Sequence, residues 1–74
     1  MDIQVFIEKF AEAIEVENVD ALTADTEFHE LEEWSSMSVM LIIAFFDEVY
    51  NKQINDKVIR QAVTIQDLYN LIEA

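Results

Sequence analysis

The sequence predicts an all-α fold, a small bundle of three main helices plus one short helix, with a long loop after the first helix. Three observations support this prediction. Apolar residues recur at helical spacing in three segments of the 74-residue chain. Apolar and polar residues do not alternate over a length useful for a strand. The chain also contains neither Gly nor Pro, which removes the usual hairpin signals.

The first helix is predicted near the amino terminus. Ile3, Ile7, Phe10 and Ile14 fall at helical spacing with Phe6 beside them, and polar or charged residues occupy the other side. This pattern is typical of an amphipathic helix that buries one face.

Residues 15–35 are predicted to form the long loop, because polar residues dominate this segment. Its isolated apolar positions should attach the loop to the core; they are Val19, Leu22, Phe28, Leu31 and Trp34. We expect the tryptophan to be packed onto the core, since this residue type is usually largely buried. Long ordered loops are uncommon and often functional.

The second helix is predicted from Ser36 to Tyr50 and is apolar almost all round. A helical projection assigns one side to the core: Val39, Ile42, Ile43, Phe46, Val49 and Tyr50. The other side is a candidate exposed patch for docking partners, and it comprises Met37, Met40, Leu41 and Ala44, near Asp47 and Glu48. Exposed apolar patches commonly mark partner sites, and methionine suits a surface that meets several partners.

Two further helical segments follow a break at residues 51–53. A short helical turn led by Asp56 is predicted through Val58, Ile59 and Ala62. The last helix is predicted to begin after Thr64, because Thr64 and Asp67 have the spacing of a capping box. Its buried stripe should comprise Ile65, Leu68, Tyr69 and Ile72.

Composition limits the class of protein. The length suits a single domain spanning residues 1–74, and a hydrophobic content of 53% is too high for a disordered acidic tail. The formal net charge of −12 disfavours nucleic acid and anionic membranes and favours basic partners, unless the acidity only promotes solubility. A deep active site would compete with so small a core, so we expect a protein that is not an enzyme.

Cellular location is predicted from the same composition. The chain has no cysteine, which excludes disulfides and thiolate chemistry and fits a reducing compartment. The first residues lack the features of a signal peptide, and the apolar run at residues 39–46 is too short to span a bilayer. We therefore expect a soluble, cytoplasmic protein. We also expect it to be a monomer.

Ser36 stands where the acidic loop meets the apolar second helix. The first backbone N–H groups of a helix are unpaired and carry partial positive charge, which makes a helix start a natural seat for a phosphate or phosphodiester. A serine hydroxyl at this place could carry one. The alternative is that Ser35 or Ser36 merely caps the helix, since serine is a preferred capping residue.

From about Thr26 to Ile72, the chain resembles an acyl carrier protein. The resemblance is carried by an ordered series of motifs around an apolar helix: Thr26-Glu27-Phe28 leading to Leu31, Trp34-Ser35-Ser36-Met37, Asp47-Glu48-Val49-Tyr50, Ile54, and Thr64-Ile65-Gln66-Asp67-Leu68. Family members attach 4′-phosphopantetheine to the serine of an Asp-Ser-Leu motif at the start of their second helix. Ser36 matches that serine.

The resemblance implies transport rather than catalysis. A phosphopantetheinyl transferase would load Ser36 from coenzyme A. The arm's thiol would then carry an acyl or aminoacyl group as a thioester to acyl-loading and acyl-processing enzymes with basic or apolar docking patches. Fatty-acid-like, polyketide-like and related pathways are all compatible with this role.

The chain departs from the family pattern around the serine. Ser35 stands where the family usually has Asp, and Met37 stands where it has Leu. Ser35, Ser38 and Leu41 also occupy positions where the family often has acids. We therefore predict that partner docking depends more on the apolar face of the second helix than is usual for the family.

The same residues suggest two alternatives to a carrier function. The first is an unmodified acidic protein-interaction module with the carrier fold, in which Ser35 and Ser36 serve only as caps. The second, a hydrolase using Ser36 with His29, is disfavoured because no Gly-rich segment supplies an oxyanion hole and nothing orients the histidine.

No metal site is predicted. His29 is the only histidine, it lies close to Glu30, Glu32 and Glu33, and the segment lacks the second histidine of a zincin motif. We expect a solvated loop histidine.

Overall fold

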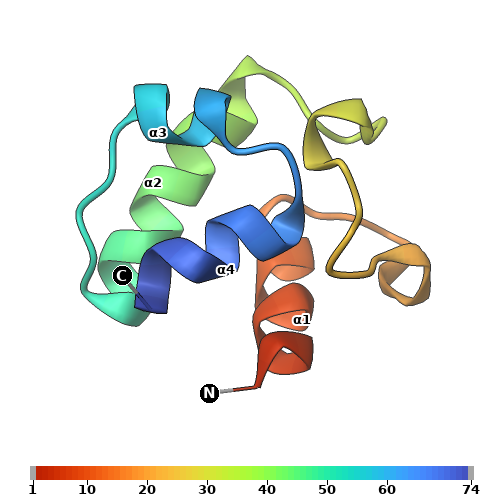
Figure 1. Cartoon of the computed structure of the whole chain (residues 1–74). Coiled ribbons are helices and arrows are strands. Elements are labelled where there is room, and N and C mark those ends of the chain that lie inside the picture. Colours follow the sequence, from red (N-terminus) through yellow and green to blue (C-terminus); the bar gives the residue numbers. More distant parts are fainter. Residues whose placement is uncertain (1, 74) are drawn as a thin grey trace.

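The computed structural model describes residues 2–73, the side chain of Glu73 excepted, so the predicted domain bounds at 1 and 74 lie outside the described residues. The described chain forms four α-helices and no strand (Figure 1). They are α1 (Ile3–Ala13), α2 (Ser36–Tyr50), α3 (Asp56–Gln61) and α4 (Ile65–Glu73). The predicted all-α fold, with one helix much shorter than the others, is confirmed.

Helix α1 begins at a capped amino terminus. The Asp2 side chain accepts a hydrogen bond from the Gln4 N–H at 3.0 Å, which satisfies one of the donors left unpaired at a helix start. The helix ends where Glu15 adopts a left-handed backbone conformation with φ of 59°. This turn lets the Val16 N–H donate to the Ala11 carbonyl at 2.9 Å and directs the chain into the loop.

Helix α2 has the predicted bounds and ends at Asn51, which adopts a left-handed conformation with φ of 53°. The N–H groups of Asn51 and Lys52 donate to carbonyls of the last turn, and asparagine tolerates this conformation better than most residues. The predicted core side is correct for Ile42 and Phe46, which are fully buried, and Val39, Ile43 and Tyr50 are partly buried.

One assignment in that projection is wrong. Val49 is 45% exposed, because it borders a surface groove shared with the polar residues Lys9 and Glu48. Phe45, which the projection did not place on the core side, is 7% exposed and packs against Phe6 of α1. The contact with α1 therefore rotates the buried stripe of α2 toward Phe45.

An aromatic cluster joins α1, α2 and α4 at the centre of the core. The fully buried Phe6 ring lies at centroid distances between 5.6 and 6.3 Å from the rings of Phe10, Phe45, Phe46, Tyr50 and Tyr69. Tilted and edge-on ring pairs of this kind add to the stability that apolar burial provides. Burial and the neighbouring Tyr69 raise the pKa of Tyr50 above its ordinary value.

The long loop is ordered by two short 3₁₀ turns, Val19–Ala21 and Phe28–Glu30, which the sequence pattern did not predict. Its apolar residues do attach it to the core as predicted: Leu22 and Phe28 are buried, and Val19, Leu31 and Trp34 are partly buried. Backbone hydrogen bonds also tie the loop to the start of α4, because the Ile65 N–H donates to the Thr26 carbonyl at 3.0 Å.

The capping box predicted for α4 is confirmed. Asp67 accepts hydrogen bonds from the N–H groups of Val63 at 2.9 Å and Thr64 at 3.1 Å, and its own N–H donates to the Thr64 hydroxyl at 3.2 Å. These two backbone donors lower the pKa of the Asp67 carboxyl. Of the predicted stripe, Ile65 and Leu68 are fully buried, and Tyr69 and Ile72 are partly buried.

In Figure 1, α4 runs across the molecule and packs against α1, while α3 packs against α2. The chain between α2 and α3 is extended, and Asn55 caps α3 by accepting the Val58 N–H at 3.0 Å. Within residues 2–73, the helices are all too short or too polar to cross a bilayer.

Candidate functional site

The amino terminus of α2 is capped by two serines, Ser35 just before Ser36 and Ser38 two residues after it. Ser35 occupies the N-cap position, and its N–H donates to the Ser38 hydroxyl at 3.0 Å. The Ser38 hydroxyl in turn donates to the Glu33 carbonyl at 3.4 Å. Ser38 is only 2% exposed, so it does not present a polar group to partners. The reason is that its hydroxyl completes the capping box.

Ser36 itself is the first residue of α2 and is exposed. The hydrogen bonds that close the helix start among the described residues use Ser35 and Ser38 and leave the Ser36 hydroxyl unused. Of the two serines, Ser35 is therefore the one that caps α2. Ser36 Oγ stands in solvent beside the unpaired first N–H groups of a helix of 15 residues.

Ser36 lies on the rim of an open groove of about 630 Å³ between α2 and α3. Trp34, Val39 and Ile43 give the groove apolar walls, and its polar border is formed by Ser35, His29, Asp56 and Arg60. A second hollow of about 480 Å³ shares Met40 and Ile43 with this groove and extends it along α2 toward Ile54. An apolar trough thus leads away from the serine along one side of α2.

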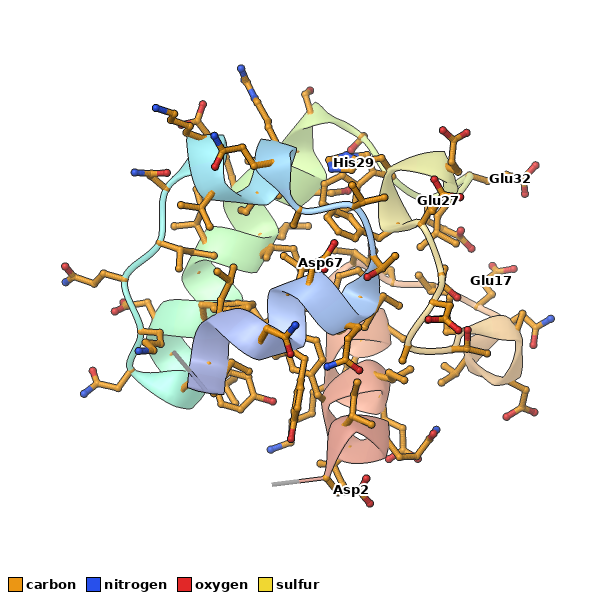
Figure 2. The ribbon with its side chains drawn as sticks, in the orientation of Figure 1. Asp2, Glu17, Glu27, His29, Glu32 and Asp67 are labelled. Atoms are coloured by element: carbon orange, nitrogen blue, oxygen red, sulfur yellow. The ribbon has the colours of Figure 1, made fainter. Side chains whose placement is uncertain are left out.

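His29 attaches the loop to the end of α3. Its Nε2 lies 3.2 Å from the Ile59 carbonyl and 3.1 Å from the Ala62 carbonyl, so Nε2 carries the hydrogen and donates to these two acceptors. Figure 2 shows the labelled ring between the loop and α3. His29 is exposed, as the prediction of a solvated loop histidine expects, but its Nε2 is hydrogen-bonded to the end of α3.

Aromatic contacts fix the same corner of the groove. The His29 ring centroid lies 4.2 Å from that of Phe28 and 5.2 Å from that of Trp34, and Phe28 and Trp34 are 4.9 Å apart. The expected packing of Trp34 onto the core is confirmed, because Phe28 is fully buried. With Nε2 already donating to α3, His29 does not offer this nitrogen as a base to Ser36.

The acidic side chains of the loop do not converge on a metal. Glu17 and Glu32 project outward in Figure 2, and Glu27 is exposed. Among residues 2–73, the His, Asp and Glu side chains form no group of three that could hold a metal ion.

The predicted docking patch is exposed. Met37 is 65% exposed and Met40 is 70% exposed, and the remaining members, Leu41, Ala44, Asp47 and Glu48, are exposed as well. Val49 extends the patch toward the end of α2, and the projection missed it. Arg60 was also missed as a lining residue of the groove that Ser36 borders, because a sequence pattern does not show that α3 lies across this groove.

Comparisons with protein-family models, with curated proteins and with solved structures find no match for this chain. The resemblance to acyl carrier proteins rests on the ordered sequence motifs between Thr26 and Ile72 and stays a prediction.

Proposed function

We propose that this chain is an acyl carrier protein whose Ser36 carries 4′-phosphopantetheine. The proposal rests on the position of the Ser36 hydroxyl. It is exposed at the first position of a long helix, takes no part in the capping bonds of that helix, and borders an apolar groove. When attached, the arm would supply a thiol that holds an acyl or aminoacyl group as a thioester.

The residues around Ser36 fit such a group chemically. The phosphodiester would lie at the positive end of the α2 dipole, beside N–H groups that have no partner within the helix. Trp34, Val39 and Ile43 offer apolar contact to the arm beyond the phosphate. The tether would raise the effective concentration of the cargo at each partner's active site.

The docking patch on α2 is the proposed contact for partner enzymes, including the phosphopantetheinyl transferase. Met37, Met40, Leu41 and Ala44 are exposed apolar or small residues close to Ser36 in the sequence, and Asp47 and Glu48 adjoin them. Charges at the edge of an interface steer the encounter, while buried apolar groups supply most of the affinity. A matching partner surface has an apolar centre and basic groups around it. We also place the carrier in the cytoplasm, with its cysteine-free composition as support.

The test is intact mass spectrometry after incubation with coenzyme A and a phosphopantetheinyl transferase. Wild type should gain the mass of one phosphopantetheine, Ser36→Ala should gain none, and the matched control Ser35→Ala should still be loaded. Circular dichroism should verify that all three proteins are folded. Loading of Ser36→Ala would show that the arm is attached elsewhere.

The second candidate is an unmodified acidic interaction module, favoured by an apolar face of α2 that is exposed whether or not Ser36 is modified. Under this alternative, the folded wild type would gain no mass with any transferase. Binding to a basic protein partner would then be the same for wild type and Ser36→Ala.

A further inference from the structure

Arg60 is the only arginine in a chain with just four basic residues, and it borders the same groove as Ser36. It lies in the last turn of α3, whereas Ser36 begins α2, so the two residues reach the groove from different helices. Its side chain is 72% exposed, and its guanidinium lies 3.4 Å from the Asp56 carboxylate one turn earlier. A cation thus stands at the groove that Ser36 borders.

The ion pair with Asp56 is easily exchanged. Exposed pairs at this spacing on a helix contribute little stability, because water screens them and both side chains lose freedom in forming them. A guanidinium binds a phosphate through two parallel N–H···O bonds, which are stronger than a single contact with a carboxylate. An anion fixed covalently to Ser36, in the groove that Arg60 also lines, would therefore compete well with Asp56.

We infer that Arg60 binds the phosphodiester carried by Ser36 and exchanges Asp56 for it when the arm is attached. The inference rests on the proposed function. The contact holds the base of the arm on the α3 side of α2, where Trp34 and Ile43 line the groove. It leaves the exposed face around Leu41 open to partner enzymes. Arg60 is thus a positioning residue for the arm.

Because Arg60 is the sole arginine, its side-chain Nε–Hε group gives one assignable signal in an NMR spectrum of the ¹⁵N-labelled protein. The signal should move when the wild type is converted from the unloaded to the loaded form. Asp56→Asn removes the competing carboxylate, so its Arg60 signal should differ from that of the wild type before loading and should converge with it after loading.

A second readout is the melting temperature, measured before and after loading. Loading should raise it by about 2–4 °C more in wild type than in Arg60→Gln. The matched control Lys57→Gln removes a positive charge from the same helix but not from the groove, so it should respond to loading as the wild type does.

An unmoved Arg60 signal in a fully loaded protein would overturn the inference and leave the proposed function intact. Equal responses of Arg60→Gln and Lys57→Gln would also overturn it, since general charge screening would then explain the effect. A wild type that is not loaded at all, as judged by mass, would refute the proposed function together with this inference.

Discussion

The two sides of α2 are both apolar in sequence, yet the rest of the chain covers only one of them. Phe45 and Phe46 contact Phe6 of α1, and Ile42 is buried in the same core. Met37 and Met40 lie on the same helix and are mostly exposed. The buried side keeps its shape through tight packing against fixed neighbours, whereas the exposed side is free to meet other proteins.

Ser36 and Ser38, two residues apart, also lie on the exposed and the buried side of α2 respectively. Ser38 points inward, is buried, and uses its hydroxyl to close the cap of α2. Ser36 points outward and contributes nothing to that cap. The same hydroxyl group therefore has a structural role at position 38 and is exposed, with no role in the cap, at position 36.

The largest predicted effect contrasts the two sides directly. Phe46→Ala should lower the free energy of unfolding by about 3–5 kcal/mol, because it opens a cavity beside Phe6 and Tyr50. Met40→Ala on the exposed side should change it by no more than about 0.5 kcal/mol. Urea denaturation of both variants, followed by circular dichroism, measures the contrast. Similar losses for the two would show that the exposed side also supports the fold.

The second prediction concerns binding rather than folding. Burying Leu41 fully in a partner would contribute roughly 1.5–3 kcal/mol, so Leu41→Glu should weaken the complex about 10- to 150-fold. The fold should survive, because Leu41 is exposed. Affinity for the enzyme that loads or processes the native cargo is the measurement.

The matched control for Leu41 is Val63→Glu, which adds the same charge at an exposed apolar position outside α2. It should leave the affinity nearly unchanged. If the two variants bind equally well, the face around Leu41 is not the docking surface.

The third prediction compares the two serines. Ser38→Ala should lower the free energy of unfolding by about 1–2 kcal/mol, because the Ser35 N–H loses its acceptor and the cap of α2 is weakened. Ser36→Ala should stay within about 0.5 kcal/mol of wild type. Thermal melts should resolve this difference, since 1 kcal/mol corresponds to about 4–8 °C in a domain of this size. A Ser36→Ala variant as unstable as Ser38→Ala would contradict the separate roles of the serines.

Local signals were sufficient to predict much of the fold. The bounds of α2 follow from its apolar run and the serines before it, and the start of α4 follows from the spacing of Thr64 and Asp67. These features depend on residues within one turn of each other. For the same reason, the place of Ser36 at the first position of α2 could be predicted from the sequence.

Features that depend on distant contacts could not be predicted. The His29 ring binds carbonyls 30 and 33 residues away in sequence. Val49 is exposed because the packing of α1 rotates the buried side of α2 toward Phe45. Arg60 reaches the groove only because α3 packs beside α2. The position of Ser36 at the start of α2 was predictable from the sequence, but the residues around it are brought together by the tertiary structure.

The smallest predicted effect is a difference in pH dependence between the cap of α2 and the cap of α4. Hydroxyl groups close the start of α2, whereas the Asp67 carboxylate closes the start of α4. Only the second cap should respond to acid. Hydrogen bonds from the Val63 and Thr64 N–H groups lower the pKa of Asp67, so the folded protein favours its charged form. Its stabilising contribution is fully present above the ordinary carboxyl pKa of about 4 and is lost as the pH falls through the lower pKa of the folded state.

Asp67→Asn should therefore melt at a lower temperature than wild type at pH 7, and the two melting curves should converge as the pH falls below about 4. Removing one negative charge from a chain of net charge −12 relieves repulsion and acts in the opposite direction. Recording the melting curves in about 0.2 M sodium chloride screens this repulsion and reduces its effect on the comparison. Asp25→Asn removes an exposed charge from the loop and no capping group. Its melting temperature therefore corrects for the charge repulsion that the salt does not screen. The hydrogen bonds to Asp67 exist only in the folded state, so protonating its carboxylate should weaken the cap. If the difference in melting temperature between Asp67→Asn and wild type stays constant from pH 7 to pH 2, the charge of the carboxylate does not strengthen this cap.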